Sequence, residues 1–284
     1  MLRLLTIEFH KLRHNKASKV LSIIYFGLLT SIALIAAIKF DIGVIQFHLA
    51  DAGIFNFPYI WHFNTYMAAI LKFFLLLVIV SMMANEYSYK TLKQNLIDGL
   101  SKKEFILSKF YAVIVFAAVS TIFVFVVSMV LGLVYSDYNE IGIIFSDLDY
   151  LFAFFLKLVG FFSFGLFFGI LIKRSAFAVG AMLVWWIIEG IIWLLLMYSY
   201  RDISSSTERF SQVEVFTQFL PFTAMGNLIT EPFTRLGAVK SLANAAGETI
   251  NKSYDINIIS VVVVSVWTFF FIYWSYILLK KRDL

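Results

Sequence analysis

The sequence has no cysteine, only three prolines and few charged residues among its 284 positions. The absence of cysteine rules out disulfides, thiolate metal ligands and thiol nucleophiles. Charged residues make up 14% of the chain, whereas soluble domains carry about 25%. The sequence also lacks a phosphate-binding G-x-x-x-x-G-K-[ST] loop, an H-E-x-x-H metal motif and a G-x-S-x-G nucleophile elbow. We therefore expect no catalytic residue, no bound metal and no cofactor held by this chain.

Apolar residues are present in large excess. They make up 61% of the sequence, and the mean hydropathy is +0.86. Soluble domains are only about 45–50% apolar. A core of this size cannot enclose all these side chains, so lipid must cover the remainder. The composition predicts an integral membrane protein.

Six apolar runs are long enough to cross a bilayer as helices, which requires about 20 residues each. The fold is therefore predicted to be all-α, a single transmembrane domain over 1–284 whose longest polar stretch is 199–255. The third run is expected to tilt or to extend beyond the bilayer, and the first lacks a signal-peptide cleavage site and is predicted to be retained. The predicted spans are 20–38, 62–84, 106–135, 150–172, 176–198 and 256–279.

Basic residues cluster in alternate connecting segments, which predicts the orientation of the chain. They lie before the first span, between the second and third, between the fourth and fifth, and after the sixth. By the positive-inside rule these segments and both termini are cytoplasmic, and 199–255 is extracytoplasmic. The net charge of +5 is thereby explained by topology, and we expect no nucleic-acid partner.

The basic leader, residues 1–19, contains a helical pattern. Leu2, Leu5, Phe9 and Leu12 recur at helical spacing. This pattern predicts an amphipathic helix lying in the inner headgroup layer. The alternative is an ordinary basic leader that only sets the topology.

The segment between the second and third spans, EYSYKTLKQNLIDGLSKKEFILSK from Glu86 to Lys109, is punctuated like a short helix between two turns. Thr91 and Gln94 have the spacing of a capping box, and Leu92 with Leu96 shares one helix face. Gly99 suits a left-handed helix end, and Ser101 with Glu104 repeats the capping box where the third span begins. The spacing alone is compatible with either a docking helix or a capped turn that joins two spans.

Here the sequence resembles the membrane subunits of type-2 ABC exporters. The residues that carry the resemblance are Glu86, Thr91, Leu92, Lys102 and Lys109, and Lys90 stands where the family commonly has glycine. The leader LLTIEFHKLRHNK resembles the family's amphipathic elbow helix. The six-span layout and the outer segment with Leu220-Pro221 agree as well.

The resemblance implies a non-enzymatic permease in the bacterial cytoplasmic membrane, with both termini cytoplasmic. It implies two copies of a separate ATPase that bind ATP and Mg²⁺, and a second permease chain as a homodimer or heterodimer. Re-entrant helices within 199–255 are implied too; a small extracytoplasmic cap is the alternative. The residues expected to couple to the ATPase are Glu86, Thr91, Leu92, Gln94, Leu96 and Lys102.

Three charges, Lys72, Lys157 and Glu189, fall inside apolar runs. A charge near the bilayer centre costs at least about 2.5–3.5 kcal/mol, so each requires a partner or a function. Their similar depth permits a Lys157–Glu189 or Lys72–Glu189 ion pair, and they could instead line a translocation pathway.

Two further features bear on packing and function. The spacing of Gly165 with Gly169, and of Ala176 with Gly180, allows close approach of helices. The alternative function is an ion-gradient-driven secondary transporter, which would need broken helices and an internal repeat. The four histidines, His10, His14, His48 and His62, are scattered and are predicted to be loop or interfacial residues.

Overall fold

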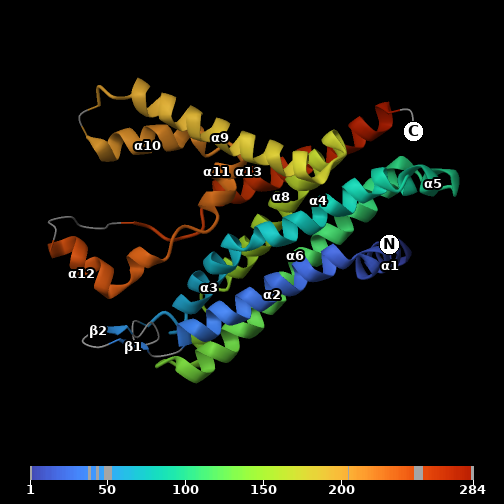
Figure 1. Ribbon diagram of the computed structural model, residues 1–284. Coiled ribbons are helices and arrows are strands. Elements are labelled where there is room, and N and C mark those ends of the chain that lie inside the picture. Colours follow the sequence, from blue (N-terminus) through green and yellow to red (C-terminus); the bar gives the residue numbers. More distant parts are fainter. Residues whose placement is uncertain are drawn as a thin grey trace.

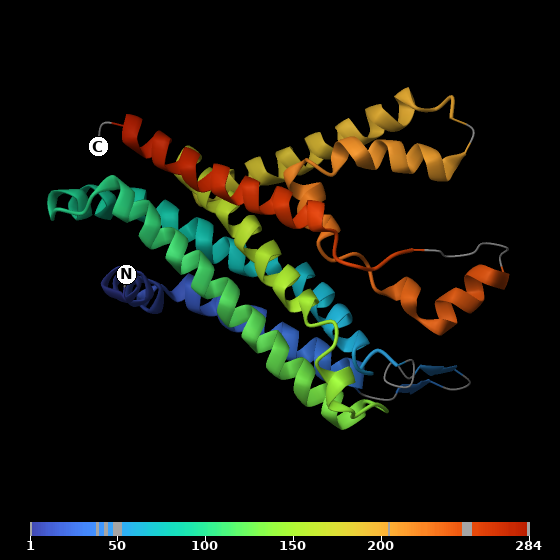
Figure 2. The same cartoon turned by 180° about the vertical axis from the view of Figure 1, so that it is seen from behind.

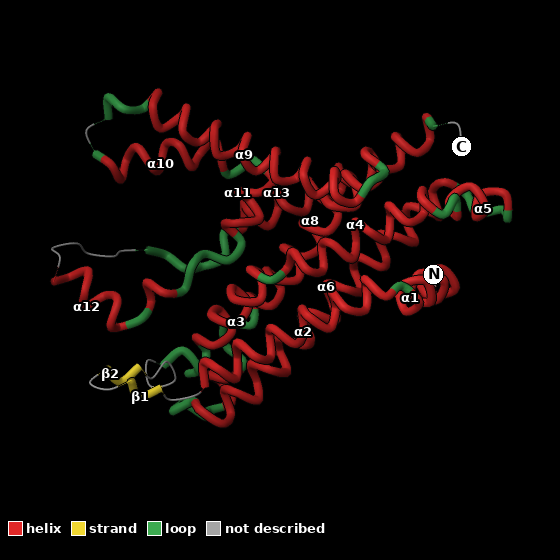
Figure 3. The backbone as a smooth tube through the Cα atoms, in the orientation of Figure 1, coloured by secondary structure: helices red, strands yellow, loops and turns green. Residues whose placement is uncertain are grey.

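Most of the described chain is helical, which confirms the all-α prediction (Figure 3). The computed structural model describes residues 2–37, 40–42, 45–47, 53–203, 205–245 and 252–282. The one addition is an antiparallel ribbon of β1 (Phe40–Ile42) and β2 (Ile45–Phe47), in which Phe40 is opposite Phe47. In chain order the helices are α1 (Leu2–His14), α2 (Lys16–Ala37), α3 (Tyr59–Ile70), α4 (Lys72–Ser88), α5 (Thr91–Ile97), α6 (Lys102–Tyr135), α7 (Ile141–Ile144), α8 (Asp149–Ile172), α9 (Ser175–Ser199), α10 (Ser206–Thr217), α11 (Pro221–Asn227), η1 (Phe233–Arg235), α12 (Gly237–Ala245) and α13 (Ile258–Lys281).

Each predicted span falls on helix. The stretches that contain α2, α6, α8, α9 and α13 are long and apolar enough to cross a membrane, and the bent pair α3–α4 supplies a sixth. The first boundary differs from the prediction, because α1 ends at His14 and α2 already begins at Lys16. Residue 38, the end of the predicted first span, lies outside the described residues.

The second span is broken, and the prediction of one continuous helix over 62–84 is wrong in this respect. The axes of α3 and α4 differ by 47°. At the break, the Leu71 amide donates to the carbonyl of Ala68, three residues back, at 3.1 Å. The Lys72 ammonium donates to the carbonyl of Ala69 at 3.1 Å. The lysine thus bonds a backbone carbonyl beside the bend, as a membrane helix requires where its ladder is interrupted.

Helix α8 forms the centre of the bundle. It packs against α3, α4, α6, α9 and α13, and 72% of its most apolar stretch is buried, compared with 11% for α9. A side chain at Gly165 would collide with Leu76 of α4, and a Cβ at Gly169 would lie 3.2 Å from that of Met83. The predicted close approach at these two glycines is therefore confirmed. On α9, a Cβ at Gly180 would meet nothing within 4 Å, so that spacing serves no contact within the described chain.

The two ends of the bundle differ. The N-terminal helix α1, helix α5 and the C-terminus lie together at one end (Figures 1 and 2). From the other half of the bundle, α9 and α10 extend as an antiparallel hairpin that diverges from α2, α3 and α6. Within the predicted outer segment, α11 packs against α8, α9 and α13 at the base of this hairpin. The short helices expected before the last span are present, and their placement relative to the bilayer stays a prediction.

Candidate functional site

Helix α5 projects beyond the bundle between α4 and α6 (Figure 1). A residue with a left-handed backbone stands on each side of it. Lys90, immediately before it, is left-handed with φ 56°, and Gly99 after it has φ 95°. Glycine adopts a left-handed backbone most easily, so Lys90 holds a conformation that is less favourable for its own residue type. At Ser101, where α6 begins, the predicted capping box is complete. The Ser101 hydroxyl accepts from the backbone amide of Glu104, and the Glu104 carboxylate accepts from the backbone amide of Ser101.

The capping box predicted for Thr91 and Gln94 is wrong. Thr91 is the first residue inside α5, and its hydroxyl donates to the Glu86 carboxylate at 2.6 Å instead of capping the helix. Gln94 is exposed. The predicted apolar face is confirmed, because Leu92 is buried and Leu96 is partly buried against the core. The side chain of Ile97 at the end of α5 is 74% exposed.

Glu86, at the end of α4, is the centre of a buried ionic network. Its carboxylate accepts from the ammonium of Lys109 on α6 at 2.5 Å and from that of Lys11 on α1 at 2.8 Å. Besides the Thr91 hydroxyl, the amide of Asn95 on α5 lies 3.5 Å from it. One carboxylate therefore joins the loop helix α5 to three longer helices.

A second carboxylate completes the network. Glu8 on α1 accepts from Lys109 at 2.6 Å and from the Ser108 hydroxyl at 3.3 Å. Lys109 is fully buried, and both of its carboxylate partners are almost so. The two carboxylates match the two ammonium groups of Lys11 and Lys109 in number, so the buried cluster is neutral overall. Such a cluster is stable only with all its members in place.

The predicted coupling residue Lys102, two turns before Lys109 on α6, joins this helix to the C-terminal helix. Its ammonium donates to the carbonyls of Lys280 and Arg282 at 3.3 and 2.8 Å. The Arg282 guanidinium in turn donates to the carbonyls of Ile170 and Leu171 at the end of α8. The start of α6 is thus fastened to two further helices.

Sequence reasoning missed Glu8, Lys11, Asn95 and Arg282 as members of this site. Glu8 carried a signal, because it is an acidic residue at helical spacing with the apolar residues Leu5 and Leu12 of α1. An acid on the buried face of a helix requires a basic partner. The partner, Lys109, is 101 residues away, which no local pattern reveals.

The expected ion pairs of Glu189 are not formed. Its carboxylate accepts from the backbone amides of Phe222 and Thr223 at 3.0 and 2.9 Å, from the Thr223 hydroxyl, and from the Trp185 indole. Glu189 therefore caps the N-terminus of α11. Four donors satisfy the buried carboxylate as well as a lysine would, and they stabilise its negative charge at the positive end of a helix.

Lys72 and Lys157 line the same space, and neither is paired with Glu189. Both line a cavity of about 380 Å³ between α4, α8, α9 and α11, and both also line a neighbouring one of about 450 Å³. Lys157 makes one long contact, to the carbonyl of Ile229 at 3.5 Å. Two of the three intramembrane charges therefore line the same cavities, and neither forms an ion pair with the third.

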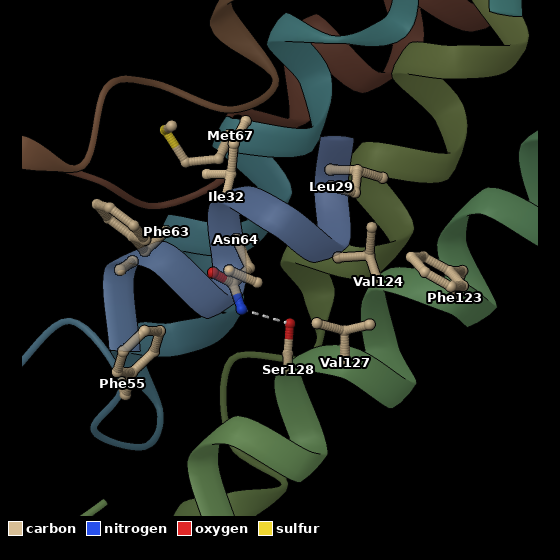
Figure 4. A pocket seen from close by; sticks show the side chains of 12 residues that line it. Leu29, Ile32, Phe55, Phe63, Asn64, Met67, Phe123, Val124, Val127 and Ser128 are labelled. Carbon is tan, nitrogen blue, oxygen red and sulfur yellow. Dashed lines mark hydrogen bonds between the residues drawn. The ribbon is translucent and has the colours of Figure 1, made fainter. Parts of the chain in front are cut away.

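Two other places carry no ligand chemistry. The pocket between α2, α3 and α6, where Asn64 donates to Ser128 at 2.8 Å, encloses about 30 Å³ (Figure 4). Ligand pockets measure about 300–1,000 Å³, so it is a packing gap.

His62 is buried, stacks on Tyr150 and bonds the carbonyl of Thr230, unlike the predicted interfacial histidine. His48 lies outside the described residues. In the described ranges no cluster of His, Cys, Asp or Glu could hold a metal.

A comparison with protein families decides between the candidate classes. Residues 3–284 match the model of the ABC-2 family transporter protein. The chain belongs to the ABC-2 transporter family. This type-2 ABC permease is a multi-pass membrane protein, the non-catalytic component of its transporter, and membership implies an ABC ATPase partner. No curated protein matches the chain.

Proposed function

We propose that this ABC-2 permease forms the pathway of an ATP-driven exporter, with α5 as the helix that docks on the ATPase. The observation that carries the proposal is the buried network around Glu86, which ties α5 to α1, α4 and α6. A displacement of α5 would therefore move the inner ends of these helices together. Such a rigid attachment is what coupling requires, because both distant sites must act on one element with two states.

The proposed complex contains two permease chains and two ATPase chains. ATP and Mg²⁺ bind only to the ATPase, and this chain holds no cofactor. The end of the bundle with α1, α5 and both termini faces the cytoplasm of a bacterial cell, and α1 lies in the inner headgroup layer as the elbow helix. Family membership favours this function over an ion-gradient-driven transporter, although one span is broken.

The exposed tip of α5 supplies a test. Replacing Ile97 with aspartate puts a charge on the exposed face of α5 that is proposed to contact the ATPase. The matched control is Ile141→Asp on α7, which follows the far end of α6. The two isoleucines are equally exposed, at 74% and 75%. An apolar anchor in a protein interface contributes about 1–2 kcal/mol, which corresponds to roughly 5- to 30-fold in affinity.

We expect the ATPase to co-purify with the wild-type chain and with Ile141→Asp. With Ile97→Asp, co-purification and permease-stimulated ATP hydrolysis should fall by roughly 5- to 30-fold. Equal recovery of the ATPase with both variants would place the docking surface elsewhere. ATP hydrolysis by the pure permease, with no second polypeptide, would refute the division of labour.

A further inference from the structure

Lys157, which is buried, and Lys72, which is partly buried, lack an anionic partner. Among the described residues no carboxylate lies within the 4.0 Å ion-pair distance of the Lys72 or Lys157 ammonium. Lys72 bonds a carbonyl and lies 4.8 Å above the ring of Phe161, and Lys157 has one long contact to a carbonyl. Two like charges in a lipid-embedded site repel each other, and burying them uncompensated is costly.

The nearby acids are already used. Glu189 accepts four hydrogen bonds at the start of α11. Glu231, which lines the larger cavity, is paired with Lys252 at 2.9 Å and accepts from Thr234. Burial raises the pKa of Glu231, but the bonds from Thr234 and Lys252 outweigh it, and the pKa is lowered overall. Neither acid is free to neutralise the two lysines.

The space around the lysines is amphipathic. The cavity of about 380 Å³ is walled mainly by aromatic and aliphatic side chains, among them Phe73, Leu183 and Trp186. These three are 42%, 46% and 62% exposed, so this cavity opens onto an apolar outer surface of the bundle. The adjoining cavity of about 450 Å³ contains polar groups such as Asn227 and Thr230. Both lysines line both cavities, at the boundary between apolar and polar surroundings.

We propose that Lys72 and Lys157 together bind the phosphate or carboxylate headgroup of an anionic amphiphile, whose tail lies against Phe73, Phe161 and Trp186. The headgroup supplies the missing negative charge, and charge-assisted hydrogen bonds from two ammonium groups are the strong kind. The aromatic wall covers the tail. The site is a property of this chain alone and does not rest on coupling to an ATPase.

The test measures lipid binding to the purified full-length chain in phosphatidylcholine nanodiscs. The probe is phosphatidylglycerol with brominated tails, which quench tryptophan, and it is compared with brominated phosphatidylcholine of the same tail length. We expect a preference for phosphatidylglycerol of roughly tenfold or more. Lys72→Gln/Lys157→Gln should abolish it. Lys103→Gln/Lys240→Gln, which changes two exposed lysines and the same total charge, should retain it.

A second variant guards against misfolding of the lysine variant. A Cβ at Gly226, which lines both cavities, would meet nothing within 4 Å, so Gly226→Leu fills the space without touching a lysine. It should also lose the preference. Competition separates sources of the anion: dodecyl phosphate should displace the probe at concentrations where inorganic phosphate does not. Equal binding of both lipids, retention of the preference without the lysines, or equal displacement by inorganic phosphate would overturn the proposal.

Discussion

Lys109 is the central cation of the buried network at the α5 end of the bundle. It is fully buried between two carboxylates that lie 78 positions apart in the chain (Glu8 and Glu86), and its ammonium contacts both. Its place on α6 puts it two helical turns after the capping box at Ser101. Removal of this one ammonium would leave two buried carboxylates close together with only Lys11 to neutralise them.

We expect Lys109→Met to lower the free energy of unfolding by about 3–5 kcal/mol, the cost of leaving a buried charge without its partner. Denaturant unfolding of the detergent-solubilised chain measures the change. Lys103→Met is the control, because Lys103 is exposed and lies one and a half turns earlier on the same helix. Equal stability of the two variants would show that the network contributes nothing to the fold.

Gly132, near the C-terminal end of α6, faces the ring of the buried Phe57. A Cβ there would collide with three atoms of that ring. Overpacking costs about 1–3 kcal/mol, while alanine gains about 1 kcal/mol over glycine in a helix. We expect Gly132→Ala to lower the melting temperature in detergent.

The control for this substitution is Gly27→Ala on α2, where a Cβ meets nothing within 4 Å. Gly27→Ala should leave the melting temperature unchanged or raise it, since only the helix-propensity gain applies. If both variants shifted it equally, the close contact at Gly132 would be without consequence.

At the scale of elements, α11 is held by a side chain from another helix. The helix has only seven residues, and no side chain of its own caps it. Isolated helices of this length are unstable in water. Glu189 on α9 binds its first free amides, so the helix preceding the last span depends on α9 for its position.

Glu189→Ala should therefore loosen α11 more than any other element. Loss of a helix N-cap costs about 0.5–2 kcal/mol, which corresponds to a rise in local opening of roughly 2- to 30-fold. Amide hydrogen exchange at Phe222 and Thr223 reports this opening. Glu214→Ala on the exposed face of α10 removes the same charge and should leave their exchange unchanged. Unchanged exchange in Glu189→Ala would mean that the cap is dispensable.

At the scale of the whole molecule, both termini, which are rich in basic residues, and α5 lie at one end of the bundle (Figures 1 and 2). The other end carries α7, which follows the 34-residue helix α6. A helix of this length measures about 51 Å, enough to cross the hydrocarbon core and extend beyond it. Helices α5 and α7 are therefore expected on opposite sides of the membrane.

The lack of cysteine makes the topology directly testable. Ile97→Cys and Ile141→Cys each introduce a single, exposed thiol. A membrane-impermeant maleimide applied to intact cells should label Ile141→Cys, and it should label Ile97→Cys only after permeabilisation. Labelling of Ile97→Cys from outside would put α5 on the wrong side for any cytoplasmic ATPase.

Much of the fold could be predicted because it depends on local properties. The number and length of the spans follow from runs of apolar residues, since each helix satisfies its own backbone in lipid. Gly99 and the capping box at Ser101 were likewise predictable, because their partners lie within a few residues. Lys72, Lys157 and Glu189 were recognised as charges that need an explanation.

Their partners were decided by contacts between residues far apart in the chain. Thr91 does not cap α5, because its hydroxyl bonds the Glu86 carboxylate five residues earlier, and that carboxylate is held in place by the distant Lys11 and Lys109. Glu189 bonded a helix end rather than a lysine, and the bend at Leu71 brought Lys72 beside Lys157 instead. A buried charge accepts any geometry that supplies enough opposite charge or dipole. The local sequence pattern therefore reveals which charged residues need a partner. Only packing in three dimensions decides which group that partner is.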